Sequence, residues 1–228
     1  MKTVCYVDGF NLYYGCLKAT SYKWLDIYKL FTRIINENNP EANLLQIKFF
    51  TAPIKTKLAS HGDAAGAAQM AYHRALTTLY PQHIFIFEGY FSLEEGSFLE
   101  YLNPPDKTRR VKIWRLEEKQ SDVNIAIEAY RDATHGAIEQ IIFVTNDTDQ
   151  EPTLKALRND YPDLRIGVIL PIKEPSSDTS ARARPGNNRL SIYADWTRSH
   201  IKNEELKSSI LPETIPTQKK AIRKPGYW

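Results

Sequence analysis

Four aspartates stand at or shortly after the ends of apolar runs in this sequence. Asp8 follows TVCYV, Asp147 and Asp149 follow IIFVT, and Asp122 comes a few residues after VKIWRLEE. The five histidines and two cysteines show no ligand spacing that would add nitrogen or sulfur donors. A metal site built from these aspartates would therefore suit Mg²⁺ or Mn²⁺, which prefer oxygen ligands. Such an ion can activate a water molecule for phosphodiester hydrolysis.

Each aspartate also has a simpler local explanation. Asp8 precedes Gly9 and fits a turn, Asp122 fits the first turn of a helix, and the Asp-Thr-Asp segment fits a polar loop. Taken one at a time, the local role is the better interpretation. A shared metal site becomes the better interpretation only if the fold brings the four carboxylates together.

The elements that must position these residues alternate along the chain. Apolar runs bounded by turn residues predict strands, and apolar residues at helical spacing predict helices. The expected strands are 3–7, 44–52, 83–91, 111–118, 138–145 and 164–172, and the expected helices are 24–35, 63–80, 122–133, 151–160 and 188–201. Residues 92–110 and 176–188 have the composition of surface loops.

The helix expected at 122–133 has the clearest pattern in the chain. An apolar stripe runs along it, and Ser121 stands where a helix N-cap is expected. The stripe consists of Val123, Ala126, Ile127, Tyr130 and Ala133. This pattern predicts an amphipathic helix.

Strands that alternate with helices to about residue 172 predict an α/β domain with a mostly parallel sheet and right-handed crossovers. In such a sheet, ligands bind beyond the carboxyl ends of the strands. If the strands ending at Asp8 and Thr145 are central neighbours, the aspartates after them meet at one edge. The last 25 or so residues are polar and interrupted by prolines, so we expect one domain over 1–202 and a tail over 203–228.

Three segments of the sequence resemble, in order and spacing, the motifs of the NYN domain family of PIN-like nucleases, including its bacterial LabA-like branch. The segments are VDGFNLYYG (7–15), EEKQSDVNIAIEAYRDA (117–133) and VTNDTDQEP (144–152), and the likeness extends through EGYF, Ala194-Asp195 and the final IRKPGYW. The resemblance implies a PIN-like Rossmannoid fold, a three-layer α/β/α arrangement around a central, mostly parallel sheet. It also implies a divalent-metal-dependent ribonuclease.

The resemblance implies roles for particular residues. Asp8, Asp122, Asp147 and Asp149 match the catalytic and metal-binding acids of the family. Asn11 matches the polar partner of the first acid, and a helix cap is its equally good alternative role. Thr145 and Asn146 stand where side chains could orient the carboxylates or a phosphate. Gln150 departs from the pattern, because the family usually has an apolar residue there.

The function predicted from these residues is hydrolysis of single-stranded RNA, more by endonuclease than by exonuclease cleavage. Arg109, Arg110, Arg182 and Arg184 are the cations expected to contact RNA phosphates, although charged runs are more often solvated surface. Two alternatives stay open. One is a non-catalytic module that binds RNA or protein, and the other is a metal-dependent enzyme that acts on a small molecule.

Composition indicates the cellular compartment of the protein but does not indicate its function. The net charge of +3 is compatible with a polyanionic partner but does not identify one. Two unclustered cysteines, the absence of a signal-peptide pattern and the absence of a long apolar run predict a cytoplasmic protein without membrane contact. A homo-oligomer is compatible with these features.

Overall fold

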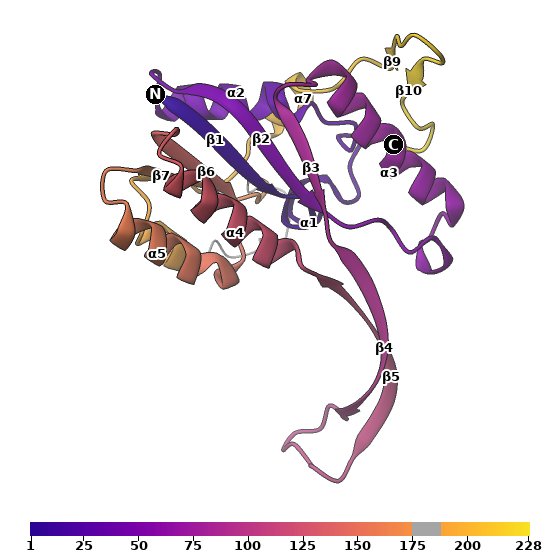
Figure 1. The fold of residues 1–228 in the computed structure, drawn as a ribbon. Helices are drawn as coiled ribbons and strands as arrows, with labels where there is room; N and C mark the ends of the chain where they lie inside the picture. Colours follow the sequence, from indigo (N-terminus) through magenta and orange to yellow (C-terminus); the bar gives the residue numbers. More distant parts are fainter. Residues whose placement is uncertain (175–187) are drawn as a thin grey trace.

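A six-stranded parallel sheet forms the centre of the computed structural model, which describes residues 1–174 and 188–228 (Figure 1). The strand order is β3-β2-β1-β6-β7-β8, so the order reverses direction between β1 and β6. The strands are β1 (Lys2–Asp8), β2 (Asn43–Thr51), β3 (Ile84–Glu88), β6 (Gln140–Val144), β7 (Arg165–Ile169) and β8 (Trp196–Arg198). This reversal is the position at which open α/β sheets usually bind their ligands.

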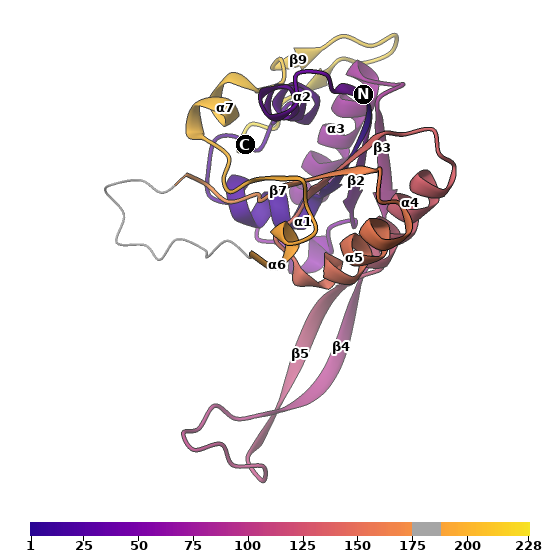
Figure 2. The ribbon, with the colours of Figure 1, turned by 90° about the vertical axis from the view of Figure 1, so that its left-hand side faces the viewer.

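Helices cover both faces of the sheet, and each face has its own hydrophobic core (Figures 1 and 2). On one face lie α2 (Ile27–Asn38), α3 (Asp63–Leu79) and α7 (Asn203–Ser208), and on the other lie α4 (Ser121–Thr134) and α5 (Glu151–Asp160). The short elements are α1 (Gly9–Leu12), a π-helical turn (Tyr13–Leu17), 3-10 turns (Thr56–Leu58 and Thr148–Gln150), α6 (Asn188–Ser191), and a ribbon of β9 (Thr214–Ile215) and β10 (Ile222–Arg223).

Strand β1 illustrates why the sequence folds this way. Cys5 and Val7 enter the core with α2 and α3, whereas Val4 and Tyr6 enter the core with α4. A parallel strand buried on both faces needs apolar residues at nearly every position, and TVCYV supplies them. The predicted three-layer α/β/α fold with a mostly parallel central sheet is confirmed.

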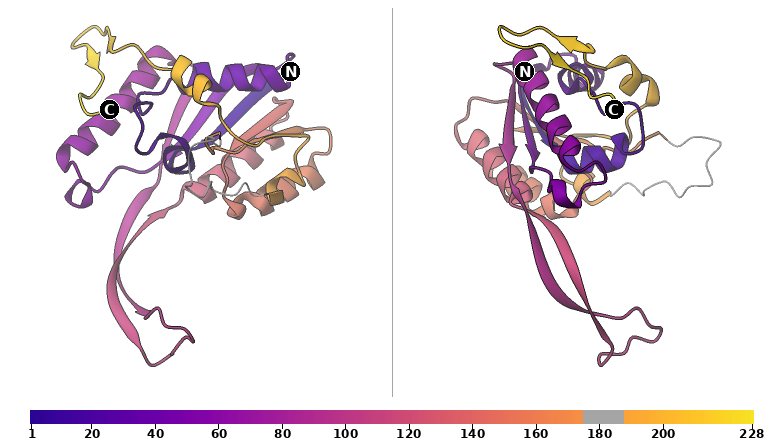
Figure 3. Two further views of the ribbon diagram at one scale, coloured as in Figure 1. Left: turned by 180° about the vertical axis from the view of Figure 1, so that it is seen from behind. Right: turned by 90° about the vertical axis from the view of Figure 1, so that its right-hand side faces the viewer.

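Strands β4 (Tyr90–Leu99) and β5 (Arg110–Lys119) pair antiparallel and project as a long hairpin away from the body of the protein (Figures 1 and 3). We call residues 90–119 the arm. The prediction of a loop over 92–110 was wrong for β4, and the strand predicted at 111–118 is not in the central sheet. Exposure on both faces removes the burial pattern by which a strand such as β4 is recognised.

Helix α4 buries a face that shares only Ala133 with the apolar stripe seen in the sequence. The residues that it buries are Ser121, Ile125, Ala129 and Ala133, whereas Val123, Ile127 and Tyr130 are exposed. Gln120, in the left-handed region, precedes the first turn and makes no side-chain cap, so Ser121 is not the N-cap. The helix carries two apolar stripes, and periodicity alone does not show which one meets the sheet.

Residues 188–201 were predicted as one helix, and that prediction was wrong. The chain forms only the short α6 and then joins the sheet edge as β8. The Asp195 carboxylate accepts hydrogen bonds from the Ile166 backbone N–H at 2.7 Å and from Arg158 at 2.8 Å. These bonds hold residue 195 against β7, so the chain does not continue into another turn of helix. Apart from Asn188, the loop expected at 176–188 lies outside the described residues.

Residues 203–228, expected as a tail, are folded against the body of the protein. Leu206, Leu211, Ile215 and Ile222 are buried in the same core as α2 and α3. The Trp24 indole N–H donates to the Pro212 carbonyl at 2.9 Å. Across the part of the chain that the structure describes, no helix has the length and apolar character needed to cross a membrane.

Candidate functional site

The reversal in strand order brings the predicted acids to one edge of the sheet. Asp8 is the last residue of β1, and Asp147 and Asp149 lie in the turn after β6, the strand that pairs with β1. Asp122 lies in the first turn of α4. The chain reaches α4 through the arm rather than from a strand of the central sheet, and Asp122 nevertheless lies at this edge.

Asp8 is buried and fully engaged by hydrogen bonds. Its carboxylate accepts from the Asn11 backbone N–H at 2.9 Å, the Asn11 amide at 2.6 Å and the Thr145 hydroxyl at 3.1 Å. Burial raises the pKa of Asp8, and these hydrogen bonds oppose that rise. Asp8 therefore caps α1 and also links β1 to residues 145–150, which we call the acidic turn. Asn11 is the polar partner of Asp8, and the capping role belongs to Asp8 and not to Asn11.

Thr145 and Asn146 hold the acidic turn against this first acid. The Asp147 backbone N–H donates to the Thr145 hydroxyl at 3.1 Å, and the Asn146 backbone N–H donates to the Asn11 side-chain oxygen at 3.4 Å. The Asp147 carboxylate accepts from the Asp149 backbone N–H at 3.0 Å and caps the 3-10 turn. The local capping role expected as an alternative is therefore present.

Asp122, Asp147 and Asp149 form what we call the carboxylate cluster, in which one oxygen from each residue lies within 4.8 Å of the others. Asp8 lies outside this set but contributes to its charge. Burial, followed by repulsion from Asp8 and Asp147, raises the pKa of Asp122 to about 6. A cation would relieve this repulsion, and an all-oxygen donor set fits Mg²⁺ or Mn²⁺.

Gln150 has a defined role that the sequence did not indicate. Its side chain is buried, and its amide N–H donates to the Asp122 carbonyl at 3.0 Å. Its amide oxygen accepts from the Thr153 hydroxyl at 3.2 Å. Gln150 therefore ties the acidic turn to the start of α4. This hydrogen bond helps to position Asp122.

The predicted phosphate-binding arginines do not join this site. Arg109 and Arg110 lie at the far end of the arm, where Arg109 pairs with Glu100 at 2.9 Å and Arg110 bonds to Ser97. Arg182 and Arg184 lie outside the described residues. Of these four predicted arginines, neither of the two that the structure describes lies at the carboxylate cluster.

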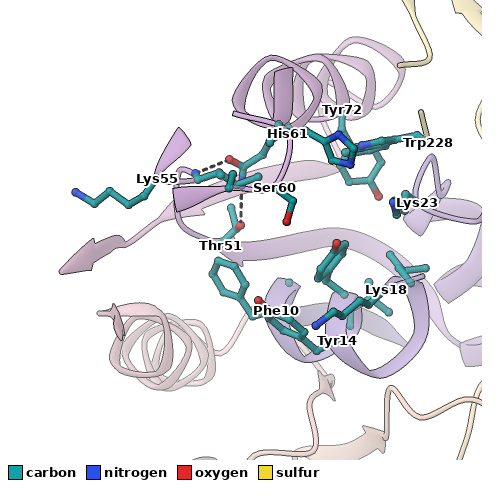
Figure 4. Close-up of a pocket in the computed structure, with 18 of the residues that line it drawn as sticks. Phe10, Tyr14, Lys18, Lys23, Thr51, Lys55, Ser60, His61, Tyr72 and Trp228 are labelled. Atoms are coloured by element: carbon teal, nitrogen blue, oxygen red, sulfur yellow. Dashed lines mark hydrogen bonds between the residues drawn. The ribbon is translucent and has the colours of Figure 1, made fainter. Parts of the chain in front are cut away.

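A second site, which sequence reasoning missed, lies on the other side of α1. It is a cavity of about 400 Å³ between α1, the π-helical turn, the end of β2, α3 and the last residues of the chain (Figure 4). We call it the aromatic cavity. The aromatic side chains that line it are Phe10, Tyr13, Tyr14, Phe49, Tyr72, Phe91, Tyr227 and Trp228.

The polar lining of the aromatic cavity is basic. Lys18, Lys23, Lys55, His61 and His73 line it, and none of the lining residues is an Asp or a Glu. The Lys18 ammonium lies 5.0 Å from the centre of the Tyr14 ring, whereas the Lys55 side chain extends away from the rings (Figure 4). Burial lowers the pKa of His73 to about 4, so this imidazole is neutral at pH 7. The cavity therefore suits a small aromatic anion.

Comparison with known proteins gives the family. The chain is 39% identical to 6-hydroxy-3-succinoylpyridine 3-monooxygenase HspA from Pseudomonas putida over 246 aligned positions, which cover all of this chain and 75% of HspA. This chain belongs to the HspA family. No model of a known protein family matches it, so the resemblance to NYN domains stays a prediction.

The HspA relationship overturns the predicted ribonuclease. HspA is named as a monooxygenase of a small molecule, which conflicts with a hydrolase, a nuclease or an RNA-binding protein. The alternative of an enzyme acting on a small molecule agrees with it better. The physical reason for the error is that acids at this edge of an α/β sheet identify a place for a ligand but not its substrate.

A solved structure confirms the fold alone. A protein of unknown function from Vibrio parahaemolyticus superposes with a TM-score of 0.51 over 89% of this chain and 94% of its own, at 16% identity.

Proposed function

We propose that this chain is an enzyme that oxygenates a small aromatic carboxylate held in the aromatic cavity. The observation that carries the proposal is the lining of that cavity, which combines aromatic rings and cations without any acidic side chain. Its volume of about 400 Å³ lies in the range of small-molecule sites. Membership of the HspA family supports an enzyme with a substrate of this size.

The substrate named for HspA matches the chemistry of the cavity. The words 6-hydroxy-3-succinoylpyridine describe an aromatic ring with a succinoyl chain that ends in a carboxylate. We expect Phe10 and Trp228 to pack against such a ring. We expect Lys18 and Lys23 to pair with the carboxylate, since a charged hydrogen bond in a partly enclosed site is stronger than a neutral one.

We also propose that the carboxylate cluster binds Mg²⁺ or Mn²⁺. Asp122, Asp147 and Asp149 would hold the ion, and its charge would offset the repulsion that raises the Asp122 pKa. When bound, the ion would supply a Lewis acid at this edge of the sheet, on the opposite side of α1 from the aromatic cavity. Asp8 and Gln150 position the three ligands through the contacts described above.

The decisive experiment follows oxygen atoms. A monooxygenase transfers one atom of O₂ to the substrate and reduces the other to water with two electrons from a reductant. Purified protein is incubated with 6-hydroxy-3-succinoylpyridine, ¹⁸O₂, NADH and Mn²⁺, with and without added flavin. We expect a product that contains one ¹⁸O atom by mass spectrometry. Substrate that binds but is unchanged under all these conditions would overturn the oxygenase proposal.

Binding is tested separately, by calorimetry without a reductant. We expect Lys18→Met and Lys23→Met each to raise the dissociation constant roughly tenfold or more, as a lost charged hydrogen bond does. Lys29→Met, on an exposed position of α2, is the matched control and should leave the constant unchanged. An analogue in which acetyl replaces the succinoyl group should bind all four proteins equally weakly. Unchanged succinoyl binding in both cavity variants would contradict the substrate assignment.

A further inference from the structure

The arm exposes apolar side chains on both of its faces. Leu93, Leu99, Trp114 and Leu116 share one face through the register of β4 and β5, and Val111 and Ile113 share the other. Trp114 is 68% exposed and Ile113 is 45% exposed. A two-stranded hairpin without a core is marginally stable in water at best, so these faces need a partner.

The outward stripe of α4 continues this apolar surface. Val123, Ile127 and Tyr130 are 60%, 49% and 39% exposed, and α4 begins two residues after β5 ends. These three side chains therefore present apolar surface that a second surface could cover.

Charge along the arm changes sign from its base to its tip. The base half, residues 90–96 and 113–119, has four acidic residues and two cations, a net charge of −2. The tip half, residues 97–112, has two acidic residues and four cations, a net charge of +2. Two arms that lie antiparallel therefore oppose each base to the other's tip, with complementary charge at both ends.

We propose that the arm joins two copies of this chain in a two-fold dimer, in which the arms lie antiparallel and each reaches toward the partner's α4 stripe. A two-fold interface requires a self-complementary surface, and the reversed charge of base and tip provides one. Ten residues of strand span roughly 33 Å, and a ribbon about 10 Å wide presents about 300 Å² per face. Arm against arm therefore buries roughly 600 Å², and the contact of each arm with the partner's α4 must supply the rest of the roughly 1,200 Å² at which stable interfaces begin.

The first test measures the size of the protein in solution. We expect the wild type to sediment as a dimer at micromolar concentration. Trp114→Glu should raise the dimer dissociation constant roughly 30-fold or more, as loss of an interface hot spot does. Met70→Glu is the control, because Met70 is 63% exposed on α3, away from the arm. A second variant replaces residues 92–117 with an Asn-Gly turn, which joins the directly opposed Phe91 and Glu118 and should be monomeric.

The second test examines the antiparallel arrangement. A tip variant, Arg110→Glu with Lys112→Glu, and a base variant, Glu94→Lys with Glu95→Lys, should each dimerise weakly because like charges then face one another. An equimolar mixture should restore the dimer, since each reversed end meets a reversed partner. A monomeric wild type, or a dimer that persists without residues 92–117, would overturn the proposal. A mixture no stronger than either variant would overturn the antiparallel arrangement.

Discussion

Asp122 is the carboxylate whose ionisation the fold itself opposes most clearly. Its pKa rises from 3.8 to about 6, first because of burial and then because of Asp8 and Asp147. Between these two values the folded state holds the proton more tightly than the unfolded state does. The free energy of unfolding therefore falls as pH rises from about 4 to about 6. Above pH 6 the folded protein carries the whole cost of ionising Asp122.

Replacing this carboxylate should stabilise the metal-free protein at neutral pH. We expect Asp122→Asn to raise the free energy of unfolding at pH 7.5 in EDTA by about 1 kcal/mol, after allowance for solvent screening of a partly exposed group. The difference should vanish near pH 4, where wild-type Asp122 is protonated. Urea unfolding at the two pH values measures it. Asp163→Asn on the exposed surface is the control, and a gain of equal size at pH 4 would contradict the explanation.

The same variant tests the metal proposal at this residue. Mn²⁺ should raise the unfolding free energy of the wild type, because an ion that binds only the folded state stabilises it. Asp122→Asn, which removes one of the three charged ligands, should gain less. If Mn²⁺ stabilised neither protein, the carboxylate cluster would be only a set of capping residues.

Among the elements, the π-helical turn Tyr13–Leu17 is the one most tightly constrained by its surroundings. A Cβ atom added at Gly15 would lie 1.7 Å from the Pro171 carbonyl oxygen, a backbone atom that cannot rotate away. This contact fixes the turn against the residues that follow β7. Because Tyr13, Tyr14 and Leu17 line the aromatic cavity, the contact also fixes one wall of that cavity.

We expect Gly15→Ala to lower the free energy of unfolding by at least about 2 kcal/mol, since overpacking against backbone forces the chain to shift. Gly226→Ala is the matched control, because a Cβ atom added there would meet no atom within 4 Å and the change should be under about 0.5 kcal/mol. Thermal and urea unfolding of both variants measure the difference. Equal stability of the two variants would show that the turn relaxes freely.

Elements that are buried on both faces could be predicted from the sequence, and those whose burial depends on distant partners could not. Strands β1 and β6 are local apolar runs, so their pattern is independent of the rest of the fold. The facing of α4 and the pairing of β8 depend on which surface they meet, which periodicity does not encode. The prediction for the arm failed for the same reason: nothing within the described part of the chain covers its exposed faces, so its sequence carries no burial pattern.

The carboxylate cluster and the aromatic cavity also differ in how far the sequence predicts them. The meeting of the four acids could be predicted because each lies at the end or start of an element at one sheet edge. The aromatic cavity could not be predicted, because its lining comes from segments as far apart as Phe10 and Trp228. A composition of 13 tyrosines, 9 phenylalanines and 4 tryptophans was the only sequence signal for it, and composition does not say where rings gather.

Across the whole molecule, α1 separates two sites of opposite charge. Asp8 and Asn11 face the acidic edge, whereas Phe10 and Tyr13 line the basic aromatic cavity. The last residues of the chain close the far side of that cavity. Trp228 packs against the buried rings of Trp24 and Tyr72, with ring centres 6.2 and 5.7 Å away.

The closing residues should control ligand binding without changing the acidic edge. We expect Trp228→Ala to weaken binding of 6-hydroxy-3-succinoylpyridine tenfold or more, because the ligand loses an aromatic wall. Mn²⁺ affinity, measured by calorimetry, should stay the same, since α1 and β1 lie between Trp228 and the carboxylate cluster and distant sites act independently. Tyr227→Phe is the control, because it loses a hydrogen bond to the Ala64 carbonyl but keeps a ring that can stack on His61. If Trp228→Ala weakened Mn²⁺ and the aromatic ligand equally, α1 would couple the two sites into one.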